Sequence, residues 1–65
     1  MARYEDVYQF VADKGYRSEE EIIAQFKDIQ AELIKIDLEY LCDKGKIRKI
    51  MFKNDRDIGN LYYRP

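Results

Sequence analysis

The spacing of apolar residues along this chain changes at Gly45. Before this glycine, apolar residues recur every three or four positions, the spacing that places them on one face of an α-helix; they are Ile34, Leu38 and Leu41. After it, residues 46–52 and 58–64 are strand-like, and the polar segment at residues 53–57 is rich in turn-forming asparagine and aspartate. A helix that ends at a glycine and is followed by a hairpin needs both helix and sheet, so we expect an α+β fold.

Two further helices are predicted upstream. The first covers Arg3–Lys14 and ends at Gly15, and its apolar side chains share one helix face; they are Tyr4, Val7, Tyr8 and Val11. The second begins after Ser18, which forms a capping box with Glu21, because each side chain can bond to the backbone N–H of the other residue. Residues 16–17 between these helices are long enough only for a fragment of a strand.

The third helix is expected to begin at the N-cap Asp28 and to run to about residue 44. The predicted order is therefore helix, short strand, helix, helix and a C-terminal two-stranded β-hairpin. The 65 residues are expected to form a single domain over residues 1–65. Its core is expected to be small, because so short a chain buries only about 60% of the surface that its unfolded form exposes.

The residue types argue against an enzyme. The chain has no histidine and a single cysteine, Cys42, which we expect to be partly buried on the flank of the third helix. A catalytic thiol needs a histidine or another base beside it. A lone cysteine forms no intrachain disulfide and no zinc site, so we expect no metal, no cofactor and a reducing, cytoplasmic location. No apolar run approaches the roughly 20 residues that span a bilayer, so no membrane contact is expected.

The order of elements, together with one apolar pattern, resembles the winged helix-turn-helix superfamily. The pattern is Ile34-x-x-x-Leu38-x-x-Leu41-x-x-x-Gly45-x-Ile47. In the superfamily the first three positions hold the third helix on the core, the glycine ends it, and the last position begins the first strand of the wing. The resemblance implies a winged-helix fold and a role in DNA binding and transcription regulation, with the third helix in the major groove and the wing on phosphate or in the minor groove.

Two smaller groups are similar to this chain in outline. They are a winged-helix segment of an RNA polymerase III initiation subunit and the ferrous-iron-transport regulator FeoC. Some FeoC proteins carry a cysteine cluster in the wing. The predicted wing of this chain has no cysteine, so an iron–sulfur site is not implied.

The outward side of the third helix is not typical of a DNA reader. The outward positions are expected to be Glu32, Lys35, Ile36 and Glu39. DNA readers of the superfamily usually carry serine, threonine, arginine, asparagine or glutamine there. Carboxylates would face the phosphates and, unlike lysine or arginine, release no counterions. We therefore expect this helix to read bases poorly.

A second apolar stripe lies beside the core stripe of the same helix. It consists of Leu33, Ile36 and Tyr40, at i, i+3 and i+7. Two interpretations remain open: the stripe packs inward against the first helix or the wing, or it is an exposed patch that binds a protein partner or a second copy of the chain. Asp37 lies between the two stripes. It is then either paired with a cation at the edge of the patch or a core residue that needs hydrogen bonds.

The charges are divided unevenly along the chain. Residues 1–43 hold five basic and eleven acidic side chains, a net charge of −6, whereas residues 44–65 hold seven basic and two acidic ones, a net charge of +5. The candidate nucleic-acid-binding residues lie in this second part and are Lys46, Arg48, Lys49, Lys53 and Arg56. Basic residues on a projecting hairpin can follow the phosphates of double-stranded DNA. The other interpretation is a charged strand edge that prevents pairing with foreign sheets.

Adjacent residues of a strand point to opposite faces of its sheet. Of Tyr62 and Tyr63, one is therefore expected to pack inward and the other to be exposed.

Two functional hypotheses follow. In the first, the chain is a small non-catalytic DNA-binding or transcription-associated protein whose basic wing contacts the nucleic-acid backbone. In the second, it is a protein–protein interaction module or a homodimer that uses Leu33, Ile36 and Tyr40.

Overall fold

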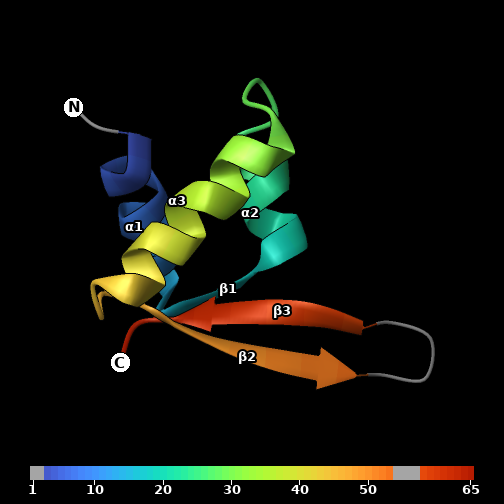
Figure 1. The fold of residues 1–65 in the computed structure, drawn as a ribbon. Coiled ribbons are helices and arrows are strands. Elements are labelled where there is room, and N and C mark those ends of the chain that lie inside the picture. The colour runs from blue at the N-terminus through green and yellow to red at the C-terminus, as the bar shows by residue number, and fades with distance from the viewer. Residues whose placement is uncertain (1–2, 54–57) are drawn as a thin grey trace.

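Three helices and a three-stranded antiparallel sheet make up a small α+β domain. The computed structural model describes residues 3–53 and 58–65. The elements follow in the order α1 (Arg3–Lys14), β1 (Tyr16–Ser18), α2 (Glu19–Gln25), α3 (Ala31–Asp43), β2 (Arg48–Lys53) and β3 (Ile58–Tyr63) (Figure 1). The α+β class and the order of elements are confirmed. The predicted turn falls largely on residues 54–57, which lie outside the described residues.

The sheet has one more strand than the predicted hairpin. Its strand order is β1-β3-β2, and both pairs are antiparallel. The fragment expected at residues 16–17 extends to Ser18 and pairs with β3, where Tyr16 lies opposite Tyr63 and Ser18 lies opposite Leu61. β3 is therefore the central strand, and its backbone has partners on both sides.

Two glycines end helices as predicted. Gly15 has a φ of 95° and Gly45 a φ of 73°, both in the left-handed region that a residue with a Cβ adopts only under strain. The backbone N–H of Gly15 donates to the carbonyl of Val11 at 2.8 Å, which closes the last turn of α1. These two caps set where α1 gives way to β1 and where α3 gives way to the loop before β2.

The start of α2 is held by Ser18 as predicted. Its Oγ accepts a hydrogen bond from the backbone N–H of Glu21 at 3.1 Å. The carboxylate of Glu21 in turn accepts a hydrogen bond from the guanidinium of Arg17 at 2.7 Å. This hydrogen bond is the main reason that the pKa of Glu21 lies below its ordinary value, and the backbone of Ser18 contributes in the same direction.

The predicted start of α3 is wrong. The helix begins at Ala31, and its N-cap is Gln30, which makes no side-chain capping hydrogen bond. Asp28 lies in the preceding turn, in which the backbone N–H of Ile29 donates to the carbonyl of Phe26 at 2.9 Å. Ile29 and Phe26 both pack against the core. This packing fixes the turn between α2 and α3, so the capping preference of aspartate is overridden.

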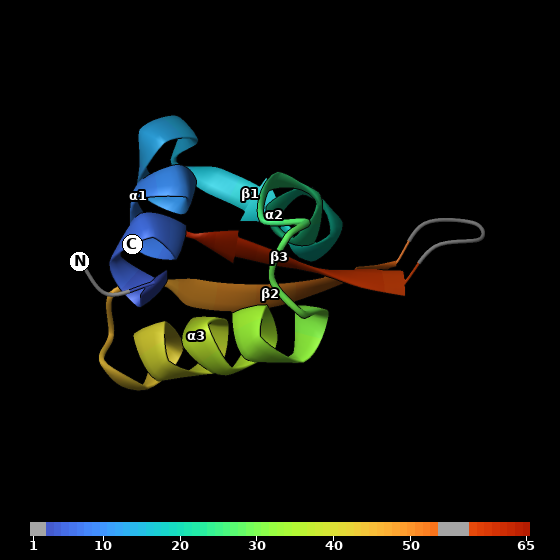
Figure 2. The same ribbon diagram turned by 90° about the horizontal axis from the view of Figure 1, so that it is seen from above.

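All three helices lie on the same side of the sheet (Figures 1 and 2). The core between them is formed by Val7, Val11, Ile22, Ile34, Leu38, Leu41, Ile47 and Tyr62. The core positions predicted for α3, which are Ile34, Leu38 and Leu41, are all buried in it. Tyr62 is 5% exposed and its hydroxyl donates to Glu19 Oε1 at 3.3 Å, whereas Tyr63 is half-buried on the other face of the sheet. Burial is the main cause that raises the pKa of Tyr62.

Candidate functional site

The outward side of α3 is acidic and apolar. The four residues predicted to point outward, Glu32, Lys35, Ile36 and Glu39, are all exposed. Glu32 and Glu39 are seven residues apart and Asp43 follows one turn later, so the three carboxylates lie along one side of the helix. We call Glu32, Glu39 and Asp43 the acidic row. The ion pairs among the described residues are Arg3–Asp37 and Arg17–Glu21, so no member of the acidic row is in one.

The second apolar stripe of α3 is exposed to solvent. The exposed fractions are 36% for Leu33, 58% for Ile36 and 41% for Tyr40. Of the two interpretations left open by the sequence, the structure therefore supports the exposed one. We call these three residues the α3 stripe. It borders the acidic row on the outward side of the helix and faces α1 on the other.

Tyr40 is held in place at one end of the α3 stripe. Its ring lies against that of Tyr4 on α1, with 4.8 Å between ring centroids and 52° between ring planes. The Nζ of Lys44 lies 5.6 Å from the centroid of the Tyr40 ring. A cleft of about 490 Å³ opens beside this pair, and Tyr8 and Lys46 also line it. Lys46 therefore lies beside the α3 stripe and not on the projecting part of the hairpin.

Asp37 connects α3 to α1 beside the α3 stripe. It is 7% exposed, and both of its carboxylate oxygens accept hydrogen bonds from the guanidinium of Arg3, the first residue of α1. The hydrogen bond and the charge of Asp37 raise the pKa of Arg3. The residue is thus both buried and paired with a cation, which combines the two roles considered for it from the sequence.

The basic residues of the hairpin do not form one patch. Lys49 is the register partner of Tyr62, whose side chain packs on the helix side of the sheet, whereas Arg48 is the partner of Tyr63 on the opposite face. Lys53 lies four residues after Lys49 and therefore points to the same side as Lys49. Arg56 lies outside the described residues. The cluster predicted from the sequence is thus divided between two faces of the sheet.

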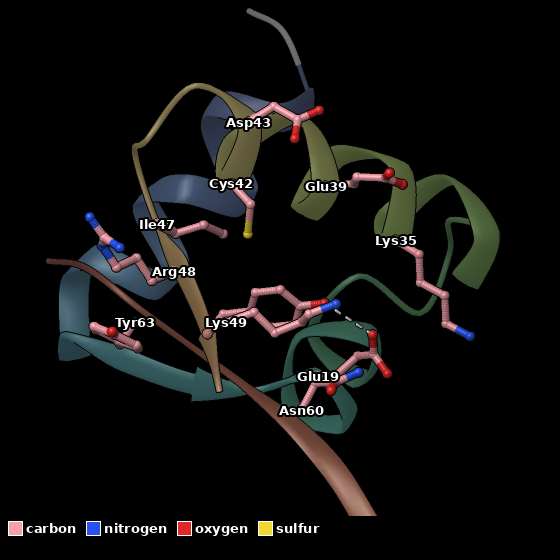
Figure 3. Close-up of a pocket in the computed structure, with 11 residues that line it drawn as sticks. Glu19, Lys35, Glu39, Cys42, Asp43, Ile47, Arg48, Lys49, Asn60 and Tyr63 are labelled. Carbon is pink, nitrogen blue, oxygen red and sulfur yellow. Dashed lines mark hydrogen bonds between the residues drawn. The ribbon is translucent and has the colours of Figure 1, made fainter. Parts of the chain in front are cut away.

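Lys49 lies in a cleft of mixed charge. The cleft has a volume of about 630 Å³ and is enclosed by α3, the start of α2 and the hairpin (Figure 3). Its charged lining residues are Glu19, Lys35, Glu39, Asp43, Arg48 and Lys49. The side chain of Arg48 projects to the other side of the hairpin (Figure 3), so the three carboxylates face two cations, Lys35 and Lys49, and this cleft has no strong attraction for a phosphate. Cys42 also lines it, and burial raises the pKa of this thiol although the charge of Lys49 acts to lower it.

The hairpin exposes large apolar side chains that are not among the site residues predicted from the sequence. The exposed fractions are 48% for Ile50, 71% for Met51 and 69% for Ile58. The register places Met51 and Ile58 toward the helix side and Ile50 on the opposite face. A signal was present in the sequence, because three consecutive apolar residues at 50–52 of a strand cannot all point into one core.

Two kinds of site are not found among residues 3–53 and 58–65. Within these ranges, no three histidine, cysteine, aspartate or glutamate side chains lie close enough together to bind a metal ion. No helix in this part of the chain is both long and apolar enough to cross a membrane.

No family model matches the chain, and no curated protein matches it.

Proposed function

We propose that this chain is a non-catalytic winged-helix module that binds a partner protein through the α3 stripe. The order of helices and strands, the glycine that ends α3 and the buried Ile47 before β2 support the winged-helix fold, because they follow the pattern that the resemblance implies. A raised thiol pKa disfavours the reactive thiolate and supports a non-catalytic role for Cys42.

One observation carries the proposal, namely the exposed α3 stripe beside the acidic row. A helix that enters the major groove must bring cations toward the phosphates, whereas three carboxylates without ion pairs in the described structure repel them. Exposed apolar side chains with an aromatic ring among them are typical of the centre of a protein interface. The contact between Tyr4 and Tyr40 also orders one end of the stripe before a partner arrives, which lowers the entropy cost of binding.

The charges beside the stripe define the chemistry of the partner. A segment that presents an apolar ridge with lysine or arginine along one flank fits, because its cations meet the acidic row while the ridge covers Ile36. A second copy fits less well when two α3 helices pack antiparallel, because the acidic row of each copy then faces that of the other. We therefore commit to a different protein with a basic, amphipathic segment.

A designed peptide tests this chemistry. The probe is a fluorescein-labelled amphipathic helix with leucines on one face and lysines on its flanks, and its matched control carries glutamates in place of the lysines. We expect the lysine peptide to bind at least about tenfold more tightly than the glutamate peptide, a difference of about 1.4 kcal/mol. Fluorescence anisotropy gives both affinities. Equal affinities would contradict the proposed charge match.

Variants of α3 locate the binding surface. Ile36→Lys should weaken binding of the lysine peptide about tenfold or more, because it places a cation in the apolar contact, beside the lysines of the peptide. The double variant Glu32→Gln with Glu39→Gln should also weaken binding of the lysine peptide. The matched control, Asp13→Asn with Glu20→Gln, removes two exposed charges that are not on α3 and should change this affinity little. Unchanged binding by Ile36→Lys would refute the site. Self-association of the wild type that is lost in Ile36→Lys would place a second copy there instead.

A second candidate function is weak binding of duplex DNA through the wing. The observation that favours it is that Lys49 and Lys53 are exposed on the same side of β2. Each phosphate contact contributes a slope of about −0.9 to log K against log salt, so Lys49→Ala with Lys53→Ala should reduce the slope by about 2. Glu32→Gln with Glu39→Gln should leave duplex binding unchanged or strengthen it. No detectable binding of duplex DNA at low salt would end this candidate.

A further inference from the structure

One face of the sheet is left open. Because α1, α2 and α3 all lie on the other side, no helix that the structure describes covers it (Figures 1 and 2). The face includes one row that crosses all three strands, in which Tyr16 of β1, Tyr63 of β3 and Arg48 of β2 are register partners. We call this the open sheet face. In Figure 3, Arg48 and Tyr63 project away from α3, on the opposite side of the hairpin from Lys49.

The two tyrosines of this row are accessible and lie beside cations. Tyr16 is 49% exposed, Tyr63 is half-buried and Arg48 is exposed. At the far end of the row the Nζ of Lys14 lies 4.9 Å from the centroid of the Tyr16 ring. The row therefore consists of two aromatic rings with a cation at each end, and it lies on neighbouring strands that are about 4.8 Å apart.

The other described strand positions of the open sheet face carry no negative charge, although Glu19 and Glu20 line a small cleft together with Ser18, Phe52 and Gly59. The register places Ser18, Ile50, Phe52, Gly59 and Leu61 on the same face, and none of these described positions is an aspartate or glutamate. Arg48 and Lys14 bring positive charge to this face, whereas Lys49 and Lys53 point to the helix side of the hairpin. The face thus combines stacking surfaces with positive charge, in contrast to the acidic row of α3.

We propose that the open sheet face binds a single-stranded nucleic acid, with one base stacked on Tyr16, a neighbouring base stacked on Tyr63, and Arg48 in contact with the phosphate between or beside them. Aromatic side chains on adjacent strands of an open antiparallel sheet stack successive unpaired bases, and basic groups beside them hold the backbone. A duplex fits poorly, because its bases are already stacked on one another. Stacking and phosphate contacts do not involve the 2′-hydroxyl, so the proposal commits to single strands of either sugar.

The experiment measures binding of short fluorescein-labelled oligothymidylate and oligouridylate probes by anisotropy. We expect Tyr16→Leu and Tyr63→Leu each to weaken both probes by about tenfold, since one stacked base is lost in each. Tyr16→Phe and Tyr63→Phe keep the ring and should bind within about threefold of the wild type. Arg48→Ala should reduce the slope of log K against log salt by about 0.7, the value of one contact to a single strand.

Controls separate this site from the other surfaces. Lys49→Ala with Lys53→Ala, on the helix side of the hairpin, should leave the loss caused by Tyr63→Leu unchanged. Ile36→Lys should leave oligonucleotide binding unchanged, so that failure of the α3 proposal and failure of this one are distinguishable. Circular dichroism of each tyrosine variant confirms that the sheet is folded.

Several results would overturn the inference. One is a phenylalanine variant that binds as weakly as the leucine variant while folded. Another is a duplex probe that binds the open sheet face as tightly as the single strands do. A polyglutamate peptide that competes equally with oligothymidylate would show that charge alone is recognised and that the partner is an acidic protein. A tenfold preference for one sugar would refute binding by stacking and phosphate contacts alone.

Discussion

Replacing Ile34 with lysine should leave most of the protein unfolded at 25 °C. Ile34 is completely buried on α3 between the helices and the sheet. Removal of such a side chain costs about 2–5 kcal/mol, and the buried ammonium adds a desolvation cost of several kcal/mol. A chain of this length has a total stability of only about 3–10 kcal/mol. Loss of the helical circular dichroism signal without denaturant is the expected observation.

Ile36→Lys is the matched comparison, two residues along the same helix. Ile36 is 58% exposed, and substitutions at such positions usually change stability by no more than about 0.5 kcal/mol. Urea titrations of both variants give the contrast directly. An Ile36→Lys protein that is destabilised as strongly as Ile34→Lys would mean that the α3 stripe packs inward.

Replacing Arg3 with leucine should destabilise the fold, and by less than the removal of one partner from a fully buried pair does. The loss arises because Asp37, whose side chain is only 9% exposed, would keep a charge without its partner. The expected loss of stability is smaller than for a fully buried pair because the Arg3 side chain is 37% exposed and partly screened by water. Chemical denaturation at neutral pH measures the difference.

The double variant Arg3→Leu with Asp37→Leu separates the ion pair from simple loss of packing. Replacing both partners of a buried pair with apolar residues is often neutral, so most of the stability should return. A double variant as unstable as Arg3→Leu alone would show that the pair does not couple α1 to α3.

Local sequence signals predicted the elements wherever tertiary contacts agreed with them. The bounds of α1 follow from the spacing of Val7 and Val11 and from the left-handed conformation that Gly15 allows. The start of α3 did not follow from Asp28, because the packing of Phe26 and Ile29 on the core determines where the chain turns. A capping preference of about 1 kcal/mol is too small to override such packing.

Whether a candidate surface is exposed depends on how the helices and strands pack together. The helical or strand period of the sequence gives the face on which a residue lies, but not whether another element covers that face. The period of α3 identifies Leu33, Ile36 and Tyr40 as a stripe, but their exposure depends on how α1 and the hairpin are placed beside it. Strand alternation alone was sufficient to separate Arg48 from Lys49, although their proximity in the sequence suggested a single basic patch. The open sheet face required knowledge that all three helices lie on one side.

The central claim is that the α3 stripe is the binding surface for a basic, amphipathic protein segment. Its most direct test is titration of ¹⁵N-labelled protein with the unlabelled lysine peptide, followed by amide chemical-shift changes of every residue. The account predicts that the largest changes lie on α3 around Leu33, Ile36 and Tyr40 and extend to Tyr4 on α1. Changes concentrated on β2 and β3, with α3 unaffected, would contradict it.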